Sequence, residues 1–126
     1  MTKNSLISVV DDDESMCRML ARAIKAAGFD VAVFRSAEEF LDSGNIAASD
    51  CLVLDVDLPG MNGIELQQHL NESGNDLSII LMSGHADEQT KKRALRAGAT
   101  EFFNKPFSIA SLVTAIRKMR QQLNPI

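Results

Sequence analysis

The segment Cys51-Leu52-Val53-Leu54-Asp55-Val56-Asp57-Leu58-Pro59-Gly60 decides the fold, because an unbroken apolar run ends at Asp55 and a turn signal follows it. Such a run is typical of a strand that is covered on both faces of a parallel sheet. Residues 6–10 form a second, mostly apolar run, and it ends in Asp11-Asp12-Asp13. If both strands lie in one sheet, their ends collect negative charge at one edge. A cation or bound protons must then offset that charge.

Two later strand-like runs end in groups that can hold an anion. Residues 79–82 are followed by Ser83, and residues 100–104 are followed by Lys105. Parallel strands place their carboxyl ends at one edge of the sheet, so these side chains should meet the acids although they are far apart in the sequence. Carboxylates, a hydroxyl and an ammonium in one place are suited to a divalent metal and a phosphoryl group.

Helical patterns alternate with these strands. Apolar residues recur at helical spacing, glycines mark helix ends, and Ser36 with Glu39 forms a capping-box pattern. Alternating units of this kind predict a doubly wound α/β fold with a parallel sheet. The predicted strands are 6–10, 31–34, 51–55, 79–82 and 100–104, and the predicted helices are 14–27, 36–44, 63–72, 88–97 and a last one that begins at Ser108.

Composition bounds the function. The chain has 126 residues and a net charge of −4, so we expect one domain without direct nucleic-acid contact, because that contact depends on neutralising phosphates. Cys17 and Cys51 lack metal-ligand spacing, and we expect them to be reduced thiols in the core. The sequence shows no apolar run of the ~18 residues that a bilayer requires. We therefore expect a cytoplasmic protein without a membrane partner.

Ordered motifs connect the chain to a known family. They are Val9-Val10-Asp11-Asp12-Asp13, residues 54–63, Met82-Ser83-Gly84, Ala97-Gly98-Ala99 and Phe103-Asn104-Lys105-Pro106-Phe107. Over about residues 5–120 the sequence resembles a response-regulator receiver domain of bacterial two-component signalling, and its later part is similar to the FixJ type. The resemblance implies a five-stranded parallel sheet in the flavodoxin-like order 2-1-3-4-5 with five flanking helices. It also implies a receiver domain over residues 1–120, with residues 121–126 as a tail or the start of a linker to an output domain.

The resemblance implies a role for each acid at the strand ends. Asp55 is expected to be the phosphoacceptor. Asp11 and Asp12 are expected to bind Mg²⁺, or Mn²⁺ in its place, together with Asp55 and the backbone carbonyl of Asp57. A carboxylate is ionised at neutral pH and needs no general base to act as a nucleophile. The side chains of Asp13 and Asp57 are additional acids near the site, and the pattern does not decide their roles.

A second group of residues is expected to sense the phosphoryl group. The resemblance places Ser83 and Lys105 against the phosphoryl oxygens and Phe102 at the position of the switch aromatic. Ser83 would move toward the phosphoryl group, and Phe102 would turn inward into the vacated space. An ordinary packed phenylalanine is the alternative for Phe102, and a solvent-exposed loop residue is the alternative for His85, which could also touch the site. The bond from Lys105 to Pro106 is typically cis in this family.

The implied function is a phosphorylation-driven switch. A sensor histidine kinase would donate the phosphoryl group in a Mg²⁺-dependent reaction, and the domain would catalyse no more than its own phosphorylation and dephosphorylation. The reporting surface would comprise the helix at 88–97, the strand after it and the last helix, because the helix at 88–97 has only a thin stripe of small apolar residues. That surface would act on an attached or partner output domain that controls transcription, or would form a phosphorylation-linked homodimer.

Two other functions compete with this one. Asp55-Val56-Asp57 also resembles the paired acids of haloacid-dehalogenase-like phosphatases, although the other acids precede that strand and the chain is short for a phosphatase with a cap. A receiver-like domain that takes no phosphate and serves only for docking is the third possibility. At the level of single residues, Asp11-Asp12-Asp13 could simply begin a helix, and Asp55 could simply begin a turn.

Overall fold

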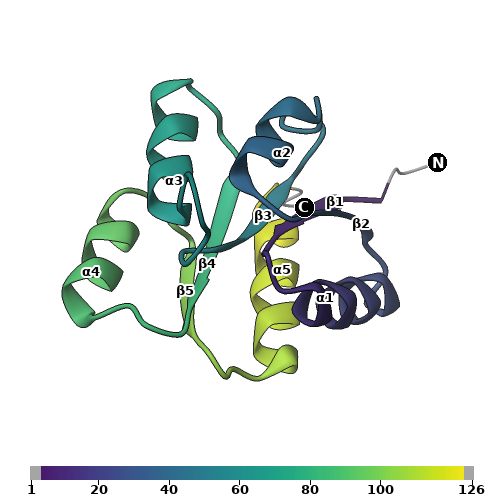
Figure 1. Ribbon diagram of the computed structural model, residues 1–126. Coiled ribbons are helices and arrows are strands. Elements are labelled where there is room, and N and C mark those ends of the chain that lie inside the picture. Colours follow the sequence, from purple (N-terminus) through teal and green to yellow (C-terminus); the bar gives the residue numbers. More distant parts are fainter. Residues whose placement is uncertain (1–3, 124–126) are drawn as a thin grey trace.

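The structure, a computed structural model, describes residues 4–123 (Figure 1). All strand pairs are parallel, and the sheet has the order β2-β1-β3-β4-β5 with helices on both faces, which confirms the predicted fold class. The elements are β1 (Leu6–Val10), α1 (Glu14–Ala26), β2 (Asp30–Phe34), α2 (Ala37–Asp42), β3 (Cys51–Asp55), α3 (Gly63–Glu72), β4 (Ser78–Ser83), α4 (Glu88–Arg96), β5 (Glu101–Asn104) and α5 (Ile109–Leu123).

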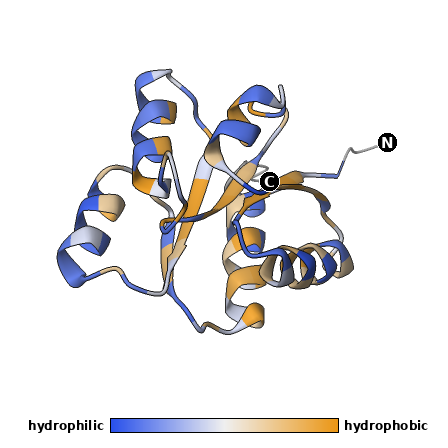
Figure 2. Cartoon of the chain, viewed as in Figure 1, coloured by the Kyte–Doolittle hydropathy of each residue, from blue (hydrophilic) through white to orange (hydrophobic). Residues whose placement is uncertain are grey.

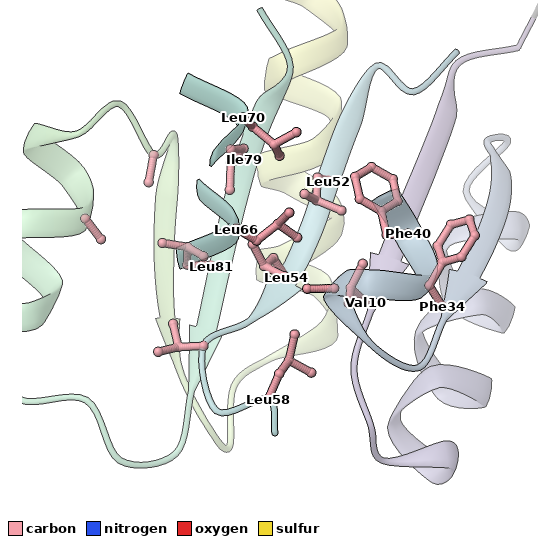
Figure 3. Close-up of a cluster of buried hydrophobic side chains, with 14 of the residues drawn as sticks. Val10, Phe34, Phe40, Leu52, Leu54, Leu58, Leu66, Leu70, Ile79 and Leu81 are labelled. Atoms are coloured by element: carbon pink, nitrogen blue, oxygen red, sulfur yellow. The ribbon is translucent and has the colours of Figure 1, made fainter. Parts of the chain in front are cut away.

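Each face of the sheet carries its own hydrophobic core. Side chains alternate between the faces along each strand, so in β3 Leu52 and Leu54 point to one side while Cys51 and Val53 point to the other. The first side packs against α2, α3 and α4, as Figure 3 shows for Phe40 and Leu66. The second side packs against α1 and α5. Figure 2 shows the strands as mostly hydrophobic and the outward helix faces as mostly hydrophilic.

Helix starts are set by side chains that accept backbone hydrogen bonds. Ser36 begins α2 as predicted, because its hydroxyl accepts from the Glu39 N–H at 3.0 Å. The Glu39 carboxylate, however, accepts from the N–H of Arg35, one residue before the cap, so the predicted capping box is only half formed. A complete capping box instead begins α3, between Asn62 and Glu65. The sequence pattern of this loop is dominated by Pro59, Gly60 and Gly63, so the box was not predicted.

The last helix begins near the predicted residue and extends further than the predicted domain boundary. The Ser108 hydroxyl accepts from the Ser111 N–H at 3.3 Å, as expected for a cap. Helix α5 continues to Leu123, three residues beyond position 120. The division between a receiver domain at 1–120 and a tail at 121–126 stays a prediction, and residues 124–126 lie outside the described part of the chain.

The expectation that both cysteines lie in the core is met. Cys17 and Cys51 are buried and form no disulfide in the described residues. Across residues 4–123, no helix combines the length and the apolar character that crossing a bilayer would require.

Candidate functional site

Three carboxylates converge where β1 and β3 end. Asp11 and Asp12 follow β1, Asp55 is the last residue of β3, and the two strands are neighbours in the sheet. One oxygen from each of the three carboxylates lies within 4.8 Å of the others. Asp11 and Asp55 are buried, at 0% and 3% exposed, while Asp12 is exposed. The predicted convergence of these acids is therefore present in the structure.

Lys105 brings a positive charge to the two buried acids. Its Nζ lies 3.1 Å from Asp11 Oδ2 and 3.3 Å from Asp55 Oδ2. The end of β5 is fixed beside that of β4, because the Lys105 N–H donates to the Ser83 carbonyl at 2.8 Å. The Lys105–Pro106 peptide bond is cis, as the resemblance implied. Residues 94 positions apart in the sequence thus form one ion-pair cluster.

Backbone groups hold the two buried carboxylates in place. The Asp57 N–H donates to Asp55 Oδ1 at 2.9 Å, and the Asp13 N–H donates to Asp11 Oδ1 at 2.9 Å. Both contacts are local turns in which an aspartate caps the N–H two residues later. They leave the second oxygen of each carboxylate for Lys105.

Burial and charge act on this cluster in opposite directions. The pKa of Asp55 is raised to about 6, and burial is the largest cause. The hydrogen bond from the Asp57 N–H and the charge of the Lys105 ammonium lower it, whereas the charge of the Asp11 carboxylate raises it further. Burial disfavours the charged form of Lys105, but the hydrogen bond to Asp11 and the charges of Asp55 and Asp11 outweigh it, so the pKa of Lys105 is raised. One lysine does not neutralise two buried acids and the exposed acid beside them.

The donor set fits a small hard cation. All three side chains offer carboxylate oxygens, which Mg²⁺ and Mn²⁺ prefer. Neighbouring ligands of octahedral Mg²⁺ lie about 3 Å apart and opposite ones about 4 Å apart, given bond lengths of about 2.1 Å. Oxygens within 4.8 Å of one another can reach such an arrangement with small rotations. The excess negative charge supplies the reason for a cation to bind there.

Ser83 lies at the same edge of the sheet, but its hydroxyl is hydrogen-bonded to groups other than the carboxylate of Asp55. Its Oγ donates to Asp57 Oδ2 at 2.8 Å and accepts from the N–H groups of His85 and Ala86, each at 3.1 Å. Among the described residues no hydrogen bond joins Ser83 to Asp55. His85 is exposed, and within residues 4–123 its side chain forms no hydrogen bond, so both interpretations of this residue stay open.

Phe102 lies inside the core, and its expected role as the switch aromatic stays a prediction. The ring is already buried, with 6% of the residue exposed, and packs in the core beside Leu81 and Ala94. An inward turn is therefore not a movement that starts from this structure. The burial agrees with the plain alternative of a packed core phenylalanine.

Arg35 is a residue of the site that sequence reasoning missed. It follows β2, the strand whose end was not considered, and its Nη2 donates to the carbonyl of Asp12 at 2.8 Å. The contact ties the loop that carries Asp12 to the neighbouring strand end. The available signal was its position, since Arg35 directly follows the only predicted strand whose end had been left without a role.

The comparisons with known proteins agree with this geometry. Residues 7–117 match the family described as response regulator receiver domain. The response regulator protein TodT of Pseudomonas putida is 41% identical over 113 residues, which is 90% of this chain and 50% of TodT. The transcriptional regulatory protein FixJ of Azorhizobium caulinodans is 36% identical over 117 residues, which is 93% of this chain and 56% of FixJ.

Solved structures have the same architecture. The response regulator StyR matches with a TM-score of 0.87 and 39% identity, over 97% of this chain and 61% of StyR. The receiver domain of the Francisella response regulator 1452 matches with a TM-score of 0.90 and 25% identity, over 96% of this chain and all of that domain (100%).

These findings define a class of protein by its fold and by the acids at one edge of its sheet. The chain belongs to the family of response regulator receiver domains. This membership favours the signalling interpretation over the phosphatase alternative. The chain spans about half the length of the curated relatives TodT and FixJ.

Proposed function

We propose that this receiver domain accepts a phosphoryl group on the carboxylate of Asp55, from a sensor histidine kinase, in a Mg²⁺-dependent reaction. The observation that carries the proposal is the convergence of Asp11, Asp12 and Lys105 on a buried Asp55. An anionic nucleophile can attack an anionic phosphoryl group more readily when positive charge lies nearby, and the chain supplies such a charge as Lys105. A bound divalent cation would add to it and would reduce repulsion between Asp55 and the phosphoryl oxygens.

The proposed chemical step is the transfer of a phosphoryl group from the donor to Asp55, and it is balanced in atoms and charge. An Asp55 oxygen forms a bond to phosphorus while the bond from phosphorus to the donor breaks, and the electron pair of that bond leaves with the donor. With phosphohistidine the leaving group is an imidazole that takes up a proton, and with acetyl phosphate it is acetate. Hydrolysis of the acyl phosphate transfers the phosphoryl group to water, which restores the Asp55 carboxylate and releases inorganic phosphate. The domain is thus a phosphoacceptor switch rather than a turnover enzyme.

The chain's own residues have distinct tasks in this proposal. The Asp57 N–H orients Asp55 through a 2.9 Å hydrogen bond. Lys105 pairs with the Asp55 carboxylate and would pair with the phosphoryl oxygens once they are bound there, and Ser83 offers a hydroxyl from β4. Asp11, Asp12, Asp55 and the Asp57 carbonyl are the proposed ligands of Mg²⁺, for which Mn²⁺ could substitute.

The proposed output surface is that of α4, β5 and α5. Ala94 is the buried residue of α4, while Leu95 is 41% exposed. Polar contacts from α3 tie α4 to the domain, since the Gln67 and Asn71 side-chain amides donate to the carbonyls of Ala94 and Ala97, each at 2.9 Å. The Asn71 contact is exposed and can be exchanged with water, and α4 buries only one residue of its own among those described, which suits an element that moves.

The wider role is part of the same proposal. Relatives named as transcriptional regulatory proteins support an attached or partner output domain that controls transcription, and the exposed α4 surface would also allow a phosphorylation-linked homodimer. Buried cysteines without a disulfide in the described residues support a cytoplasmic location.

The test is covalent modification. The domain is incubated with Mg²⁺ and acetyl phosphate, and intact mass spectrometry is expected to show the added mass of one phosphoryl group. Asp55→Asn should show none, whereas Asp76→Asn, which removes an exposed acid from a distant loop, should match the wild type. Modification of Asp55→Asn to the wild-type level, or its absence from the wild type, would refute the proposal.

A further inference from the structure

The side chain of Asp57 has an unexpected partner. Its Oδ2 accepts two hydrogen bonds from the end of β4, from the Ser83 hydroxyl at 2.8 Å and from the Gly84 N–H at 3.2 Å. Ser83 is 1% exposed, whereas Asp57 itself is exposed. An anionic acceptor makes such hydrogen bonds stronger than a neutral one would. The carboxylate of an exposed residue thus reaches in to bond a buried hydroxyl.

The position of Asp57 places this carboxylate beside Asp55. The two residues are bonded to each other, since the Asp57 N–H donates to Asp55 Oδ1 at 2.9 Å. Asp55 and Ser83 end neighbouring strands, with Asp55 in register with Met82. A phosphoryl group on Asp55 would present anionic oxygens at this same strand edge. It would meet donors that a carboxylate already occupies.

The hydrogen-bonding capacity of Ser83 makes the two acceptors exclusive. A serine hydroxyl has one proton to donate and two lone pairs that accept. In the structure the N–H groups of His85 and Ala86 donate to Ser83 Oγ, and the proton goes to Asp57. All three capacities are therefore in use. A phosphoryl oxygen can receive the Ser83 proton only after the Asp57 carboxylate has released it.

We propose that the Asp57 side chain is an internal competitor that occupies the Ser83 and Gly84 donors until a phosphoryl group on Asp55 displaces it. The inference rests on the proposed function, because it assumes an anion on Asp55. Displacement breaks a charged hydrogen bond but leaves no buried unpaired charge, since the exposed carboxylate of Asp57 can turn into water. Repulsion between the incoming phosphoryl oxygens and the carboxylate assists the exchange.

The exchange would also reach α4. Ser83 Oγ holds the backbone of His85 and Ala86, and Asp87, the next residue, caps the first turn of α4 through the Thr90 N–H at 2.8 Å. If Ser83 moved from Asp57 to the phosphoryl group, it would therefore move the loop that leads into α4. The competitor would hold this loop in its unphosphorylated arrangement.

The test uses beryllofluoride, a stable mimic of the phosphoryl group, at saturating Mg²⁺. Wild type, Asp57→Ala and Asp57→Asn are titrated, and the amide resonances of Gly84 and Ala86 are followed by NMR. Asp57→Ala is expected to bind beryllofluoride about tenfold more tightly, the effect of one charged hydrogen bond that no longer needs to be broken. The affinity of Asp57→Asn for beryllofluoride should lie between those of wild type and Asp57→Ala, because an amide oxygen is a weaker acceptor than a carboxylate oxygen.

Asp13→Asn is the matched control. It removes one negative charge from the same edge of the sheet, and asparagine retains the capping of α1 that Asp13 provides through the N–H groups of Ser15 and Met16. A gain in Asp57→Ala well above that in Asp13→Asn supports the competitor. A second readout needs no ligand: in Asp57→Ala alone, the Gly84 and Ala86 resonances should move toward their positions in the beryllofluoride-bound wild type.

The outcomes separate this inference from the proposed function. Wild type that binds beryllofluoride, with Asp57→Ala within about twofold of it or no tighter than Asp13→Asn, would overturn the competitor and leave the proposed function standing. Binding by neither protein would overturn both. Binding by Asp57→Ala but not by wild type would support a competitor stronger than we expect.

Discussion

At the scale of single residues, Asp55 carries an electrostatic conflict. The carboxylate is 3% exposed and lies in a cluster with the buried Asp11, and one ammonium, that of Lys105, serves both. Burial raises its pKa to about 6 for this reason. Without metal, a carboxylate buried in this way destabilises the folded domain, and a cation that binds beside it offsets that destabilisation.

The conflict predicts how stability depends on pH without metal. The pKa of Asp55 is about 6 in the folded domain and near its ordinary 3.8 in the unfolded chain, so the folded domain binds more protons between these values. The free energy of unfolding in EDTA should therefore fall as the pH rises from about 4 to about 6, by on the order of 2–3 kcal/mol from this group, and stay lower above pH 6.

Asp55→Asn removes this titration. In urea unfolding followed by circular dichroism, the mutant should be more stable than wild type at pH 7.5 in EDTA, with the difference shrinking toward pH 4.5. Asp76→Asn controls for the loss of one exposed acid. A constant difference between Asp55→Asn and wild type across this range would contradict the prediction.

At the scale of elements, the loop between β3 and α3 is fixed by a close backbone approach. A Cβ on Gly63 would lie 2.5 Å from the Asp55 carbonyl oxygen and 2.7 Å from the Val56 Cα. The Gly63 N–H also donates to the Val56 carbonyl at 3.0 Å. The first residue of α3 therefore lies against the end of β3, which sets the position of Asp55 and Asp57.

This approach predicts the effect of Gly63→Ala. The added methyl group meets backbone atoms that cannot turn aside, so the loop or α3 must shift, at a cost of about 1–3 kcal/mol. Because the shift moves the end of β3, phosphorylation by acetyl phosphate should slow as well. Gly84→Ala is the control for stability, since its Cβ would meet nothing within 4 Å. Equal stability of the two variants would contradict the prediction.

Sequence patterns predicted the elements well and their polar contacts less well. The apolar runs of β1, β3 and β4 and the acids after them identify strands and ends, because covered parallel strands leave little other choice of residue. The hydrogen bond from Ser83 to Asp57 was not predicted, since side chains from neighbouring strand ends compete for one proton and spacing does not rank them. The expected contact of Ser83 with phosphoryl oxygens stays a prediction. Arg35 was missed for a similar reason, as its contact is to a backbone carbonyl.

At the scale of the whole molecule, residues at the ends of four of the five strands lie together at one edge of the sheet and form one polar site. Asp55 and Ser83 are the last residues of β3 and β4, and Asp11 and Lys105 directly follow β1 and β5. Their positions depend on both cores, since α1 and α5 pack on one face and α2, α3 and α4 on the other. Anything that binds at this edge therefore binds the folded state alone, because the unfolded chain does not bring these acids together.

This linkage predicts that Mg²⁺ stabilises the domain. At a free concentration of about ten times its Kd, a cation that binds only the folded state should raise the free energy of unfolding by about 1.4 kcal/mol, and Tm by roughly 4–6 °C. Scanning calorimetry at pH 7.5 measures the shift. Asp12→Ala removes an exposed ligand without opening the core and should lose most of it, whereas Asp76→Asn should keep it. At pH 5 the shift should shrink in wild type, because a proton on Asp55, whose pKa is raised to about 6, competes with the cation. An undiminished shift in Asp12→Ala would place the cation elsewhere on the molecule.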